Sequence, residues 1–143
     1  MRALLDVNVL IALLDAGHLH HGLAMDWLAG EIGHGWASCP ITQNGCIRIM
    51  SQPAYPAALP TGEVALRLRE AAASPDHTFW ADSIDLLQTD AIDWQRVLGH
   101  RQVTDAYLLA LAVHHRGRLV TFDTRIAVDA VRHARAKHLV VLG

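Results

Sequence analysis

The chain lacks long uninterrupted apolar runs and is poor in cysteine. Its two cysteines, Cys39 and Cys46, have neither the CxxC spacing of a redox or zinc motif nor the number needed for a disulfide framework, so we interpret both as reduced packing residues. No apolar run reaches the roughly 18 residues of a membrane span, and Asp6 and Asn8 interrupt the N-terminal segment that is otherwise most like a signal peptide. We therefore expect a cytoplasmic protein without membrane association.

Apolar residues are plentiful enough for one packed domain. They make up 52% of the sequence, which favours a folded globule over disorder. A length of 143 residues fits one domain with a sizeable core. We predict a single domain over residues 1–143.

The charges are unevenly distributed, although the net charge is only −2. Residues 1–95 hold 4 Arg and 11 acidic residues, whereas residues 96–143 hold 8 basic residues and 3 acidic ones. A basic segment beside an acidic centre suits a surface that follows nucleic-acid phosphates. The same distribution also fits solvated helix faces, and charge spacing alone leaves both interpretations open.

Short apolar segments alternate with helical patterns along the chain. We predict strands at 2–6, 34–39, 77–80, 118–122 and 138–142. We predict helices from 9 to 14, over 19–30, from Pro40 onward, and over 61–73, 83–98, 102–116 and 124–136. Such alternation requires crossover connections, so the expected fold is a three-layer α/β/α sandwich with a mostly parallel sheet of four or five strands.

Acidic residues stand at the carboxyl ends of two predicted strands. Asp6 follows a short apolar run and precedes Asn8, and Asp123 ends a similar run near the other end of the chain. In a parallel α/β sheet the ligand crevice lies outside the carboxyl ends of the strands, so both carboxylates should enter one crevice. A third acid, Asp105, follows Thr104 at the start of the strongest helical pattern. Together they predict an acidic metal site, because Mg²⁺ and Mn²⁺ prefer hard oxygen ligands.

Each acid also has a structural interpretation. A strand-terminal Asp can cap the next helix, which applies to Asp6 and Asp123. Asp105 would be favourable in a first helical turn through the helix dipole. Zinc is a weaker alternative, because the ten histidines lack the spacing of a zinc site.

Four short segments carry a family resemblance. They are Asp6-x-Asn8, Thr42-Gln43-Asn44-Gly45 with Arg48, Thr104-Asp105-Ala106-Tyr107 and Thr121-Phe122-Asp123. In this order and at this chain length they resemble the PIN-domain family, and within it the VapC-type toxins of bacterial toxin–antitoxin modules. The resemblance covers nearly the whole chain. It implies a PIN-like fold and a metal-dependent endoribonuclease that cleaves structured RNA, is inhibited by a VapB-type antitoxin and forms a homodimer.

The resemblance also implies roles for individual residues. Asp6, Asp105 and Asp123 would be the catalytic residues and would bind Mg²⁺ or Mn²⁺. Supporting groups would orient carboxylates or water, or contact RNA phosphate; they are Asn8, Gln43, Thr104, Thr121 and Arg48.

Gln43 departs from the commoner family pattern, in which many relatives carry Glu. If Gln43 lies in the acidic crevice, Gln43→Glu should tighten metal binding. The missing charge also leaves open a catalytically weak or silent PIN-like module that binds RNA or antitoxin. An aspartyl-phosphate enzyme is a further alternative, but its D-x-D motif is not matched, since Asn8 stands at the second position. Metal-dependent RNA cleavage by the purified protein distinguishes these alternatives.

Overall fold

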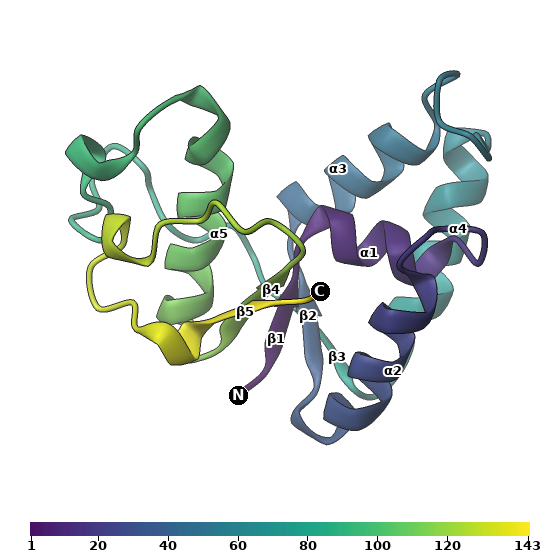
Figure 1. The fold of residues 1–143 in the computed structure, drawn as a ribbon, viewed down its shortest axis with the longest axis horizontal. Coiled ribbons are helices and arrows are strands. Elements are labelled where there is room, and N and C mark those ends of the chain that lie inside the picture. The colour runs from purple at the N-terminus through teal and green to yellow at the C-terminus, as the bar shows by residue number, and fades with distance from the viewer.

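Five short strands form the centre of the structure, a computed structural model that describes residues 1–143 (Figure 1). The strands are β1 (Ala3–Leu5), β2 (Trp36–Ser38), β3 (His77–Phe79), β4 (Arg118–Thr121) and β5 (Leu139–Val141). Their order in the sheet is β3-β2-β1-β4-β5, and every neighbouring pair is parallel. The five predicted strands are confirmed, and the first strand of the chain is the central one.

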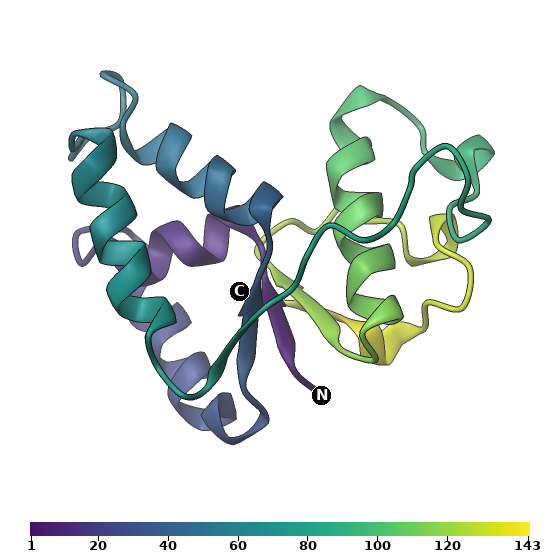
Figure 2. The same cartoon turned by 180° about the vertical axis from the view of Figure 1, so that it is seen from behind.

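Helices cover both faces of this sheet, as the alternating sequence pattern predicts. The α-helices are α1 (Val7–Leu14), α2 (His21–Glu31), α3 (Pro40–Met50), α4 (Thr61–Ala72) and α5 (Val103–His114). Helices α1 to α4 lie on one face and α5 lies on the other (Figure 1). In the view of Figure 2, the chain after β3 passes in front of the other strands to reach α5. None of these helices has the length and hydropathy needed to span a membrane.

The strands contribute to two separate cores. Leu4 and Leu119 pack with the buried residues of α5, whereas Leu5 and Val120 pack with Leu10 of α1. Successive strand side chains point to opposite faces of a sheet. Because both faces of the sheet are covered, the central strand β1 is apolar and buried at every position.

The predicted helix over 83–98 is wrong. A single 3₁₀ turn, Trp94–Arg96, forms in this segment. The side chains of Asp85, Thr89 and Asp93 each accept a hydrogen bond from the backbone N–H two residues later. Such local hydrogen bonds offer the backbone an alternative to the helix.

The predicted helix over 124–136 is also wrong, and only the 3₁₀ turn Val128–Ala130 forms there. Val131 is extended and pairs antiparallel with Ile92, and His133 has a φ of 67°, in the left-handed region. The two irregular segments therefore contact each other, and together they cover α5 on the side away from the sheet.

Candidate active site

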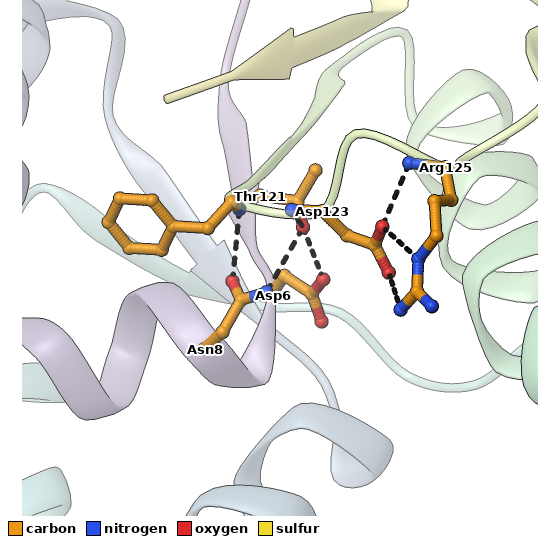
Figure 3. Close-up of polar contacts among 6 residues, drawn as sticks. Asp6, Asn8, Thr121, Asp123 and Arg125 are labelled. Carbon is orange, nitrogen blue, oxygen red and sulfur yellow. Dashed lines mark hydrogen bonds and ion pairs between the residues drawn. The ribbon is translucent and has the colours of Figure 1, made fainter. Parts of the chain in front are cut away.

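Asp6 and Asp123 follow adjacent strands at one edge of the sheet. The pairing of β1 with β4 places Leu5 opposite Val120, and the Asp6 N–H donates to the Val120 carbonyl at 2.9 Å. Figure 3 shows the two acids with Thr121 close to both. The topology thus brings together residues from opposite ends of the chain, as the strand-end positions predict.

Asp6 is the most enclosed of the three acids, with only 7% of its surface exposed. Its Oδ1 accepts from the Val7 N–H at 2.7 Å, so it caps α1 as well as facing the site. Burial raises the pKa of Asp6; the hydrogen bonds from Thr121 and Val7 act against this, and nearby Asp123 adds to it. The Asp6 side chain therefore caps α1 with one carboxylate oxygen and faces the acidic site with the other.

The Thr121 hydroxyl connects the acids to Asn8. It donates to Asp6 Oδ2 at 2.7 Å and accepts from the Asp123 N–H at 3.0 Å and from Asn8 Nδ2 at 3.3 Å. Asn8 Oδ1 in turn accepts from the Phe122 N–H at 3.2 Å. These contacts fix the Asp6 carboxylate and the turn after β4 relative to each other (Figure 3).

Asp105 lies in the first turn of α5 and is half-buried. Burial raises its pKa to about 6, and the negative charges of Asp6 and Asp123 contribute to this rise. The three acids are thus close enough to repel one another. No three His, Cys, Asp or Glu side chains form a group that could hold a metal ion as they are placed.

Arg125 forms an ion pair with the carboxylate of Asp123. Its Nε donates to Oδ1 at 3.1 Å and its Nη2 to Oδ2 at 3.2 Å, while its backbone N–H donates to Oδ1 at 2.8 Å. These contacts lower the pKa of Asp123. Arg125 is not among the site residues predicted from sequence, although it stands two residues after a strand-end acid.

The carboxylates of Asp6, Asp105 and Asp123 are ligands of the chemical type that a divalent cation prefers. Hard cations take carboxylate oxygens, and a cation relieves the repulsion that raises the pKa of Asp105. Neither Asp6 nor Asp105 forms an ion pair with Arg, Lys or His. These two carboxylates therefore have no competing cation, whereas a metal ion at Asp123 would compete with Arg125.

A hollow of about 380 Å³ is lined by Val7 and Thr104, the chain neighbours of Asp6 and Asp105. Polar residues that line it include Asn44, Arg48, Asp82 and Thr104. Arg48 and Thr104 both line this hollow, and their supporting roles stay a prediction. Asp82 was missed, although it lies just beyond the end of β3, at the same edge of the sheet.

Gln43 is not among the residues that line this hollow. Its amide donates to Ser38 Oγ at 3.0 Å, and that oxygen lies 2.8 Å from His77 Nε2. Gln43 is therefore hydrogen-bonded to a side chain of β2, and to none of the three acids.

The parallel sheet and the acids at its edge are those of a PIN domain. Residues 3–131 match the PIN domain family, and the chain belongs to it. PIN-domain ribonucleases generally use a divalent metal ion.

Within this family, the chain is similar over its full length to VapC ribonucleases. It is 51% identical to Ribonuclease VapC44 of Mycobacterium tuberculosis, over 99% of this chain and 100% of the relative. It is 44% identical to Ribonuclease VapC39 of the same species, over 91% of this chain and 94% of the relative.

Two solved structures share the fold at low sequence identity. VapBC2 from Rickettsia felis, bound to a DNA fragment from its promoter, matches with a TM-score of 0.63 and 12% identity over 100% of both chains. VapC20 of Mycobacterium tuberculosis, a toxin that cleaves the sarcin-ricin loop, matches with a TM-score of 0.58 and 14% identity over 81% of this chain and 85% of the other. The predicted PIN-like fold is confirmed.

Proposed function

We propose that the chain is a metal-dependent endoribonuclease, the toxin of a type II toxin–antitoxin system, and that it hydrolyses phosphodiester bonds of structured RNA. The placement of the acids carries this proposal: paired strands bring Asp6 beside Asp123, and Asp123 lines one hollow with Asp105. The full-length similarity to Ribonuclease VapC44 supports it. VapC20, which shares the fold, is a toxin that cleaves the sarcin-ricin loop, and for this chain we propose a structured RNA of the tRNA or rRNA class.

Asp6, Asp105 and Asp123 are the proposed ligands of Mg²⁺ or Mn²⁺. When bound, such an ion polarises the scissile phosphate and lowers the pKa of a coordinated water. Thr121 and the Val7 N–H hold the Asp6 carboxylate in one orientation through its two oxygens. The Asp6 carboxylate thus has a defined position before substrate arrives.

Arginines beside the acids are the proposed contacts for RNA phosphates. Arg101 and Arg125 line a small hollow together with Asp105 and Asp123. Arg48 is exposed and lines the larger hollow together with Thr104. Arginine suits this role because its planar guanidinium can bind a phosphate through two N–H groups.

The proposed partners are a VapB-type antitoxin and a second copy of the chain, and the proposed compartment is the cytoplasm. An apolar hollow of about 160 Å³ supports a protein partner. Its lining includes Leu14, Met25 and Leu68, from α1, α2 and α4. Met25 and nearby Leu23 are exposed, and a rimmed apolar patch is typical of a binding surface.

Incubation of the purified chain, freed of antitoxin, with total cellular RNA tests the proposed activity. Sequencing of the RNA ends should show new ends at discrete positions with Mg²⁺ or Mn²⁺ and none with a chelator. An Asp6→Asn preparation made in parallel controls for contaminating nucleases. RNA or antitoxin binding without new ends would instead support the silent-module alternative.

Thr121→Val should lower kcat/KM by about 10- to 100-fold, the usual cost of losing a group that orients a metal ligand. Valine keeps the shape of threonine but removes the hydroxyl that donates to Asp6 and accepts from Asn8. Thr124→Val is a matched control, because Thr124 is exposed. Steady-state cleavage of one RNA by the three proteins measures this effect. Equal activity of both variants would show that the Thr121 hydroxyl is dispensable.

Gln43→Glu should leave metal affinity nearly unchanged, because the Gln43 side chain contacts Ser38 and none of the acids. A charge outside the site is largely screened at physiological salt. Calorimetric titration of Mn²⁺ into both proteins at one pH measures this. Tighter binding by the variant would show that position 43 reaches the acidic centre.

A further inference from the structure

A short row of aromatic rings continues from the acidic site onto the loop between α1 and α2. Phe122, between Thr121 and Asp123 in the chain, stacks on His20 with ring centroids 5.0 Å apart and an interplanar angle of 27°. The ring of His18 lies 5.8 Å from that of His20, tilted by 49°. His20 is exposed, and the other two are partly exposed. We call His18, His20 and Phe122 the aromatic ledge.

Backbone contacts hold the ledge in place. The Phe122 N–H donates to Asn8 Oδ1, and the Phe122 side chain packs against the core on the α1 face of the sheet. The His20 N–H donates to His18 Nδ1 at 3.0 Å. The His20 ring itself makes no hydrogen bond and does not cap α2. The exposed His20 ring therefore contributes to the structure only through its stacking on Phe122.

We propose that the aromatic ledge binds an unpaired base of the RNA substrate next to the scissile phosphate. This inference rests on the proposed endoribonuclease function. Unpaired RNA bases stack on aromatic side chains, histidine included, and such stacking tolerates any base because every base has a π-face.

The position of the ledge sets the path of the RNA. Phe122 is adjacent in the chain to Thr121 and Asp123, whereas Arg125 and Arg101 lie on the far side of Asp123. An RNA strand that crosses the edge of the sheet therefore places phosphates near the arginines and a base on His20. The site selects RNA in which a nucleotide beside the cleaved bond is unpaired.

RNA binding by variants at position 20 tests this proposal. A fluorescently labelled, mixed-sequence single-stranded RNA is titrated with Asp6→Asn protein, which should not cleave it, and with the same protein carrying His20→Ala. Loss of one base–aromatic stack costs about 1–3 kcal/mol, or a factor of roughly 5 to 150 in affinity. We expect His20→Ala to weaken binding by at least about fivefold. His20→Phe should restore binding because it keeps the ring.

His114→Ala is the matched control. His114 is also exposed and its ring lies 5.1 Å from that of His115, but it is at the end of α5 remote from Asp105. Its loss should leave RNA affinity unchanged. In cleavage assays of the otherwise unmodified chain, His20→Ala should raise KM and change kcat little.

Four results would overturn the ledge proposal. Equal affinity of the His20→Ala protein and its parent, or failure of His20→Phe to restore affinity in a folded protein, would overturn it and leave the proposed ribonuclease intact. An equal loss with His114→Ala would do the same. If the unmodified chain neither binds nor cleaves RNA with metal present, both the ledge and the proposed function are wrong.

Discussion

Asp6→Asn is expected to abolish RNA cleavage without unfolding the chain. The change removes a carboxylate that we propose as a metal ligand, so kcat/KM should fall by more than the about 10- to 100-fold cost of losing an orienting group. The amide oxygen of asparagine can still accept from the Val7 N–H and keep the cap of α1. A variant that cleaves RNA at a normal rate would reject the proposed mechanism.

The same variant should be at least as stable as the unmodified chain at neutral pH. The pKa of Asp6 is raised in the folded state, so the folded chain binds the proton more tightly than the unfolded chain, where the value is near 3.8. The stability contributed by this group is present below pH 3.8 and is lost as pH rises through the folded-state pKa. Thermal melts without metal, at acidic and neutral pH, test this.

Asp105→Asn should also reduce cleavage by more than about 100-fold, since it removes a second proposed ligand. Its effect on stability is easier to measure. The pKa of Asp105 rises from 3.8 to about 6, so the unmodified, metal-free chain should lose stability as pH rises through this range. A shift of this size corresponds to at most about 3 kcal/mol, and partial exposure to solvent reduces the expected effect to about 1 kcal/mol.

Comparison of melting temperatures at about pH 4 and pH 7.5 measures the Asp105 effect, because most of the range between the unfolded-state pKa of 3.8 and the folded-state pKa of about 6 lies between them. The melting temperature should fall less between these two pH values in Asp105→Asn than in the unmodified chain. Asp26→Asn, at an exposed position on α2, is the control and should leave the drop unchanged. Added Mn²⁺ should stabilise the unmodified chain at the higher pH and have much less effect on Asp105→Asn, because an ion bound to the folded state stabilises it. An unchanged pH dependence in Asp105→Asn would show that Asp105 is not the group responsible.

The placement of the acids could be predicted because it depends on topology. Asp6 and Asp123 follow buried strands, and any parallel sheet gathers such positions at one edge. The orientation of Gln43 could not be predicted in this way. Neighbouring residues on a helix point about 100° apart, so the rotation of α3 about its axis decides that Asn44 and not Gln43 lines the hollow.

The two wrong helices have a different cause. Segments 83–98 and 124–136 contain enough apolar residues to suggest helices, and those residues do pack against α5. Short side chains such as Asp85 and Asp93 hydrogen-bond to the nearby backbone and favour turns instead. The spacing of apolar residues alone does not show that such side-chain hydrogen bonds will favour a turn over a helix.

The central position of β1 determines when the molecule can become active during its synthesis. β1 is translated first, yet it pairs with β4, and the hydrogen bond between Asp6 and Thr121 joins residues 115 positions apart. Contacts between such distant residues form late in folding. A ribosome-bound chain that ends before residue 118 carries Asp6 and Asp105 but lacks the strand that places them together. The acidic site can therefore form only after β4 has been synthesised.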